Sequence, residues 1–309
     1  MRAQYRRGLP TLALLGVTAS WGSTFFLIKD LLHQISVLDF LALRFAIAGV
    51  VAFALAHRSV FRLSRREVGH AVLLGLVYGT AQVLQTLGLS QTSASVSGFV
   101  TGMYVVATPI FGAGLFREHI RATVWLAVAL AATGLAFLAL HGLSVSLGVG
   151  LIFAAAMLYA VHIVGLGQWS RSDNAVGLSV VQLIVIGALC LVVTAPTGVA
   201  GPHTLGGWSS LLYMALVPGA LAILAQTWAQ AHLSATRTAV IMTMEPVWAA
   251  FFAVLFGGES LTARMLVGGA FVLTAMYLVE LGPRGGSEDP PDGAPPPTQT
   301  PAPAPHLPL

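Results

Sequence analysis

Residues 81–98 read AQVLQTLGLSQTSASVSG, and residues 222–239 read AILAQTWAQAHLSATRTA. These stretches open a longer match, because residues 81–133 and 222–274 align without a gap, 141 positions apart, with 12 of 53 positions identical. Shared polar positions raise this match above what a chain rich in Ala, Leu and Val gives by chance. They include Gln85/Gln226, Thr86/Thr227, Ser93/Ser234 and Glu118/Glu259. The sequence therefore predicts two copies of one structural unit.

The composition is that of a chain built for lipid. Hydrophobic residues make up 56% of the 309 residues and charged residues only 8%, against about a quarter charged in soluble domains. One cysteine, Cys190, excludes an internal disulfide framework and a cysteine-based metal cluster. The net charge of +4 comes from arginines scattered between apolar runs, which argues against a nucleic-acid surface.

No motif for catalysis or for a cofactor appears along the chain. A nucleophile elbow, a phosphate-binding loop and a histidine–glutamate zinc motif are all missing from the sequence. We therefore expect neither an enzyme activity, nor a cofactor, nor a metal site. The expected partners are a small-molecule substrate and the lipid bilayer, without nucleic acid.

Ten stretches are long and apolar enough to cross a membrane as helices, which needs about 20 residues each. The first follows a basic N-terminus but runs on to Leu32, too long for a signal peptide, so we interpret it as a retained helix. The ten expected spans are 11–31, 38–57, 69–90, 95–116, 122–140, 148–167, 175–195, 208–231, 235–256 and 263–281. The predicted fold class is thus an all-α integral membrane protein with ten transmembrane helices.

The arginines predict the orientation of these spans. With both termini in the cytoplasm, 12 arginines fall on the inner side, while Lys29 and Arg264 alone lie outside. This bias follows the positive-inside rule and places the chain in the cell membrane as a multi-pass protein. Each half holds five spans, an odd number, so the second half enters the membrane the opposite way round. The two five-helix repeats therefore have inverted topology.

The same reading divides the chain into five parts. The last part, from Gly282, has ten prolines and almost nothing apolar to bury, which predicts a disordered tail. The parts are a cytoplasmic N-terminus (1–10), repeat 1 (11–140), a connector (141–147), repeat 2 (148–281) and a Pro-rich cytoplasmic tail (282–309).

Glu245 is the sharpest candidate for chemistry, because it lies about 15 Å deep in the ninth span, near the bilayer midplane. Ionisable groups at that depth are usually functional, although a carboxyl bonded to a nearby helix is the alternative. Pro246 follows directly and removes a backbone donor, so the carbonyl of Met242 should be free to meet a ligand, water or a neighbouring hydroxyl.

Five further residues should face protein or a cavity rather than lipid. Arg44 lies about 9 Å below the outer surface, too deep to reach water, and could serve an ion pair or a substrate anion equally well. Tyr104 is the repeat mate of Glu245. For Tyr104, Trp21 and the mates Gln85 and Gln226, cavity lining and helix-to-helix packing both stay open.

At this point the chain resembles the EamA type of the drug/metabolite transporter superfamily, over residues 11–281. The carrying motifs are Trp21-Gly22-Ser23, Leu43-Arg44-Phe45, Thr92-Ser93-Ala94-Ser95, Ser234-Ala235-Thr236, Met244-Glu245-Pro246-Val247 and Gly257-Gly258-Glu259-Ser260-Leu261. The resemblance implies two inverted five-helix bundles around a central cavity that exchange small organic solutes by alternating access. It further implies a secondary transporter, an exporter, of a small metabolite such as an amino acid or a drug-like solute.

This resemblance places the candidate residues at the cavity. The residues expected to line it are Glu245, Trp21, Tyr104, Arg44, Gln85 and Gln226. Pro246 and Pro109 are expected to break helices, although they are not repeat mates. An intramembrane or lipid-handling enzyme and a non-transporting scaffold are the alternative functions. Substrate, direction, coupling ion and the choice between monomer and homodimer stay open.

Overall fold

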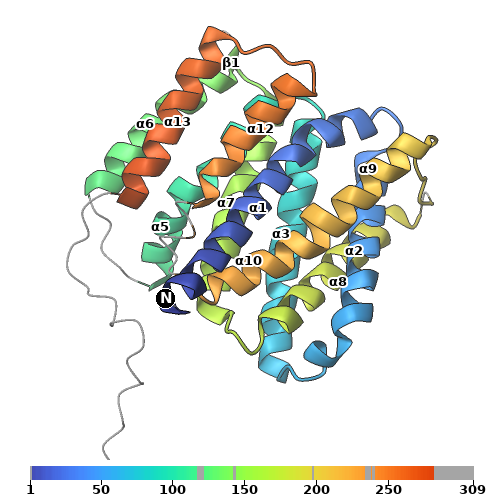
Figure 1. The fold of residues 1–309 in the computed structure, drawn as a ribbon. Helices are drawn as coiled ribbons and strands as arrows, with labels where there is room; N and C mark the ends of the chain where they lie inside the picture. The colour runs from blue at the N-terminus through green and yellow to red at the C-terminus, as the bar shows by residue number, and fades with distance from the viewer. Residues whose placement is uncertain are drawn as a thin grey trace, which may run out of the picture.

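The computed structural model describes residues 2–116, 122–141, 144–196, 198–233, 238 and 241–281. Figure 1 shows its helices packed side by side in one bundle. The helices are α1 (Arg2–Leu31), α2 (Val37–Val60), α3 (Arg65–Leu89), α4 (Ala94–Thr101), α5 (Met103–Phe116), α6 (Ala122–Ala139), α7 (Leu147–Trp169), α8 (Ala175–Thr194), α9 (Leu205–Ala215), the π-helix η1 (Leu216–Leu221), α10 (Ala222–Gln230), α12 (Met244–Leu255) and α13 (Ala263–Leu281). The expected tail and Glu118 lie outside the described residues.

A two-stranded hairpin occupies the expected connector. Strand β1 (Leu140–His141) pairs antiparallel with β2 (Ser144–Val145), and α7 begins two residues later. The hairpin therefore joins the sixth and seventh helices without room for a soluble domain between them.

Seven helical segments are long and apolar enough to cross a membrane. They are Leu9–Leu31, Val37–Val60, Arg65–Leu89, Ala94–Gly114, Leu147–Trp169, Ala175–Thr194 and Leu205–Gln230. Three shorter apolar helices, Trp125–Leu138, Met244–Leu255 and Ala263–Leu278, fall within the other three expected spans. The predicted class, a helical multi-pass membrane protein, is confirmed, while the count of ten crossings stays a prediction.

Serine side chains begin several of these helices. Ser36, Ser64, Ser93 and Ser146 precede α2, α3, α4 and α7, and each side-chain oxygen accepts the backbone N–H of the residue three positions later. Such a cap satisfies an amide that the first helical turn leaves unpaired. At Ser64, Glu67 returns a bond to the Ser64 amide and completes a capping box. The helix starts are thus encoded locally.

Glycines let helices α2 and α8 approach closely at the centre of the bundle. A methyl group on Gly49 would lie 3.3 Å from the carbonyl oxygen of Leu183, and one on Gly187 would lie 3.0 Å from that of Phe45. The order of these contacts, Gly49 with Leu183 and Phe45 with Gly187, makes the two helices antiparallel. Close backbone approach through small residues is the usual packing of helices in lipid.

The same contacts are reciprocal under one shift of numbering. Adding 138 to Phe45 and Gly49 gives Leu183 and Gly187, so the contact between Gly49 and Leu183 repeats as the contact between Gly187 and Phe45. Helices α2 and α8 are thus related as by a two-fold axis. Where residue i of one helix contacts residue j of the other, the repeat mate of i contacts the repeat mate of j.

Two small apolar clusters follow the same relation. Val100 packs with Ile152 in one cluster, and Ile241 packs with Leu14 in the other. Ile241 is 141 positions after Val100, and Ile152 is 138 positions after Leu14. Equivalent residues are therefore 138 positions apart in the first two helices of each half and 141 positions apart in the later helices. The second half has three more residues between these two groups of helices.

The fourth expected span, 95–116, is interrupted. Helix α4 ends at Thr101, Gly102 forms a turn, and α5 begins at Met103. Thr243, which is 141 positions after Gly102, is likewise a turn, directly before α12. The two interruptions are therefore repeat mates.

The expected break at Pro109 was misplaced. Pro109 lies inside α5, which continues to Phe116. A proline there removes one helical hydrogen bond, to Val105, and the bonds on either side are enough to keep the helix continuous. Pro246 lies in the first turn of α12, where its missing N–H leaves the carbonyl of Met242 without a helical donor.

Candidate functional site

A cavity of about 40 Å³ lies between the two halves of the chain. The structure places Trp21, Arg44, Gln85, Tyr104, Gln226 and Glu245 around it. Helices α1, α2, α3, α5, α10 and α12 supply them.

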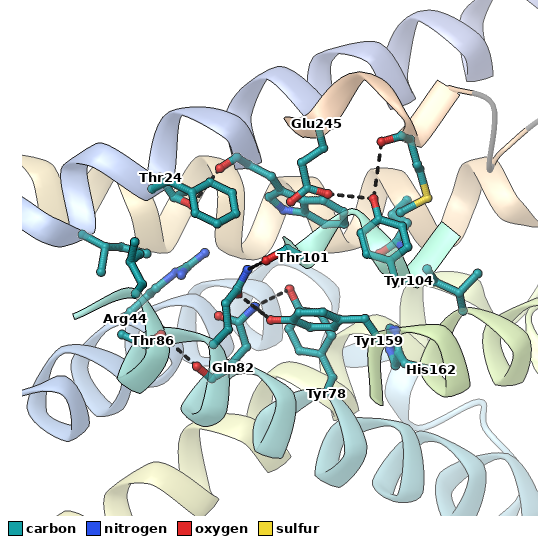
Figure 2. A pocket seen from close by; sticks show the side chains of 18 residues that line it. Thr24, Arg44, Tyr78, Gln82, Thr86, Thr101, Tyr104, Tyr159, His162 and Glu245 are labelled. Carbon is teal, nitrogen blue, oxygen red and sulfur yellow. Dashed lines mark hydrogen bonds between the residues drawn. The ribbon is translucent and has the colours of Figure 1, made fainter. Parts of the chain in front are cut away.

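Tyr104 and Glu245 meet at one end of this cavity (Figure 2). The Tyr104 hydroxyl donates to Glu245 Oε2 at 2.7 Å and lies 3.4 Å from the carbonyl oxygen of Met242. That carbonyl is the one which Pro246 deprives of its helical donor, so a neighbouring hydroxyl takes the place of the missing N–H. Tyr104 and Glu245 each follow a helix break by two residues, which brings the repeat mates face to face.

Arg44 lies at the other end of the cavity and is only 2% exposed. Its Nε donates to the carbonyl oxygen of Met214 at 3.1 Å, and its guanidinium lies 5.0 Å from the ring centre of Phe45. The Met214 carbonyl is free because Pro218, four residues on, has no N–H. Among the described residues Arg44 forms no ion pair with Glu245, so the two charged groups face the cavity separately.

One wall of the cavity carries a continuous chain of hydrogen bonds. Gln85 Nε2 donates to Thr101 at 3.0 Å, and the Tyr159 hydroxyl donates to Gln85 Oε1 at 2.7 Å. Gln82 Nε2 then donates to the hydroxyls of Tyr159, at 2.8 Å, and Tyr78, at 3.1 Å. These bonds tie α3 to α4 and α7, and they satisfy the polar groups that the wall presents to the cavity.

The tyrosines of this wall were missed by the sequence analysis. Tyr159 lies 138 positions after Trp21, so extending the repeat into the first two helices of each half would have identified it. The repeat mate of Tyr78 is Gly219, which has no side chain, so the repeat would not have identified Tyr78 as a cavity residue. His162 Nε2 donates a 2.7 Å hydrogen bond to Gln182 Oε1 and also borders the cavity.

The opposite wall, on α1 and α10, is less well satisfied. Trp21 Nε1 donates to the carbonyl oxygen of Pro218 at 3.0 Å. Gln226 is 2% exposed, and among the described residues its Oε1 has no hydrogen-bond partner. The two walls are thus related by the repeat but differ in their bonding.

The N-terminus of α4 is held from two sides. Glu259 accepts the amides of Ala94 at 2.6 Å and Ser95 at 3.1 Å, and Lys29 donates to the carbonyl oxygen of Thr92 at 2.8 Å. A carboxylate at a helix N-terminus is favourable because it bonds free amides and faces the positive end of the helix dipole. Glu259, from the second half of the chain, thus caps a helix of the first half.

Metal-binding side chains do not gather in the described part of the chain. No group of three or more His, Cys, Asp or Glu residues is found there. What the cavity offers chemically is an arginine, a carboxyl group, amides and aromatic rings, which suit binding of an organic solute.

Comparison with known proteins gives the family. The model of the EamA-like transporter family matches the chain twice, over residues 9–140 and 146–281. An uncharacterized transporter of Archaeoglobus fulgidus is 28% identical over 274 residues, which cover 87% of this chain and 85% of the relative. An uncharacterized transporter of Synechocystis is 24% identical over 293 residues, covering 87% and 88%.

A solved crystal structure shares the fold. It superimposes with a TM-score of 0.63 at 18% identity, covering 88% of this chain and 97% of its own. The family match extends over most of the chain and includes both halves. The chain belongs to the EamA-like transporter family.

Proposed function

We propose that this protein is a secondary transporter that moves a small organic metabolite across the cell membrane by alternating access, and that the central cavity binds the solute. The observation that carries the proposal is the pair Tyr104–Glu245, repeat mates that meet at one end of the cavity. Transporters built from repeats bind their substrates at the interface between the repeats, near the bilayer midplane. Family membership supports the same conclusion.

The proposed architecture is ten crossings in two inverted repeats, with both termini in the cytoplasm. The reciprocal contacts of α2 and α8 support it, since equivalent helices that cross antiparallel are those of an inverted repeat. Helices α6 and α13 support it too. Arg264, near the start of α13, donates to the carbonyl oxygen of Phe137, near the end of α6, and Figure 1 shows the pair running in opposite directions.

The cavity chemistry favours a solute with both an anionic and a donor group, such as an amino acid. The two terminal nitrogens of Arg44 have no hydrogen bond to the described protein and are available to a carboxylate. Glu245 Oε1 is similarly without a partner among the described residues, and it is available to an ammonium group or a proton. The proposed direction is export.

The test is flux through reconstituted vesicles. Glu245→Gln keeps the shape of the side chain and removes its charge, so we expect solute-driven or pH-driven flux to fall at least about tenfold. The matched control is Thr133→Val on α6, whose exposed hydroxyl only returns to Ala129 of its own helix. Wild-type flux in Glu245→Gln would remove Glu245 from the mechanism. If solute moves only from the extracellular face of the protein to its cytoplasmic face, the protein is an importer and the proposed direction is wrong.

A further inference from the structure

Gln226 on α10 is a buried glutamine whose side-chain oxygen has no hydrogen-bond partner among the described residues. Its side chain is 2% exposed and borders the cavity, and its Oε1 has no hydrogen bond within the described residues. A buried amide oxygen left unpaired destabilises the folded state, whereas an apolar side chain of similar size at the same place does not. The fold therefore gives the oxygen of this amide no structural partner among the described residues.

The repeat mate of Gln226 shows what is missing. Gln85 has both ends of its amide bonded, its Oε1 to the hydroxyl of Tyr159 and its Nε2 to Thr101. On the other wall the position equivalent to Tyr159 is Trp21, because 21 + 138 = 159. The position equivalent to Thr101 is Met242, because 101 + 141 = 242.

Neither replacement can serve Gln226. The indole N–H of Trp21, which would have to donate to Oε1, is already bonded to the Pro218 carbonyl at 3.0 Å, and the Met242 thioether offers Nε2 only a weak acceptor in place of the Thr101 hydroxyl. One wall of the cavity is thus internally satisfied, and the other holds an amide oxygen that no described residue bonds. The unpaired oxygen of Gln226 is therefore the group by which a near-symmetric cavity can distinguish a solute with an N–H donor from one without it.

Two other features of the cavity define that ligand. The terminal nitrogens of Arg44, unbonded within the described residues, favour an anionic group. Trp21, Tyr78 and Tyr159 supply aromatic faces, which favour a flat ring. We infer that the solute is a flat organic anion with an N–H donor, that Arg44 binds its carboxylate, and that Gln226 Oε1 accepts its N–H. This inference rests on the transport function proposed above and adds a substrate class to it.

The first experiment uses two probes that differ in a single donor. Indole-3-acetate and 1-methylindole-3-acetate share a ring and a carboxylate, but only the former has an N–H. Binding to the purified full-length protein is measured by calorimetry. The wild type should bind indole-3-acetate about three- to tenfold more tightly, which is the strength of one net hydrogen bond. Gln226→Leu should bind both probes equally, through lost affinity for indole-3-acetate.

The outcomes separate this inference from the transport function. An undiminished preference in Gln226→Leu would overturn the role of Gln226, and failure of the wild type to bind either probe would overturn the substrate class. Tight, N–H-dependent binding without flux of indole-3-acetate into vesicles would instead contradict transport while leaving the binding role of Gln226 intact.

A second experiment needs no ligand. Thermal unfolding of Gln226→Leu should occur at the wild-type temperature or above, because the change removes an unsatisfied buried group. Gln85→Leu should unfold at a lower temperature, because it removes the acceptor of the Tyr159 hydroxyl proton and the donor to Thr101. Equal losses in the two variants would show that Gln226 is a structural residue and would overturn the inference.

Discussion

At the scale of single residues, Tyr104 and Glu245 act as a pair. The Tyr104 hydroxyl is the only donor to the Glu245 carboxyl among the described residues. Tyr104→Phe keeps the ring and removes that donor, which should lower flux by roughly tenfold, as expected for a lost hydrogen bond to a charged group of about 1.5 kcal/mol. The check is a double-mutant cycle with Glu245→Gln in vesicles. Strictly additive losses would show that the two residues act independently.

The candidate residues could be found from sequence because polarity at depth in a membrane restricts where a side chain can face. Glu245, Arg44 and Gln226 are too polar for lipid, and all three border the cavity. Their partners could not be found in the same way. The carbonyl that accepts from Arg44 belongs to Met214, 170 positions away, and is free only because of Pro218. Sequence shows that a carbonyl is released, but packing decides which donor reaches it.

At the scale of helices, the glycines of α2 and α8 set how closely the halves approach. Gly187→Leu would press a side chain against the backbone of Phe45, where a Cβ already lies 3.0 Å from the carbonyl oxygen. Backbone cannot move aside cheaply, so we expect destabilisation of about 1–3 kcal/mol. Thermal unfolding in detergent measures it. The same substitution at Gly167 of α7, with nothing within 4 Å, should be tolerated, and equal losses at both sites would contradict this reason.

Helix breaks were harder to predict than helices. Apolar length located the helical segments, but proline was a poor guide to their interruptions, since Pro109 lies inside α5 and the break lies at Gly102. Gly102 packs tightly, because a Cβ there would lie 3.2 Å from both Met276 and Pro246. That constraint comes from helices distant in sequence. The symmetric placement of the breaks at Gly102 and Thr243 could be recognised only once both were seen.

At the scale of the whole molecule, the inverted repeat predicts that equivalent turns face opposite sides of the membrane. His33, in the turn between α1 and α2, and Ser172, in the turn between α7 and α8, are both exposed. They are suitable sites for a single introduced cysteine. The native Cys190 is first replaced by alanine, the residue at its repeat mate Ala52, because 52 + 138 = 190. This background should fold, since both positions are buried and apolar.

In that background, a membrane-impermeant maleimide should label His33→Cys in intact cells and Ser172→Cys only after the membrane is opened. The reason is that 12 arginines fall on the side of Ser172 and two basic residues on the side of His33 in the proposed topology. Labelling of both cysteines from the outside would contradict the proposed topology, because the antiparallel contacts of α2 and α8 require the two turns to face opposite sides. The two halves would then not be related by an axis in the membrane plane. The meeting of Tyr104 and Glu245 in the cavity would need a different explanation.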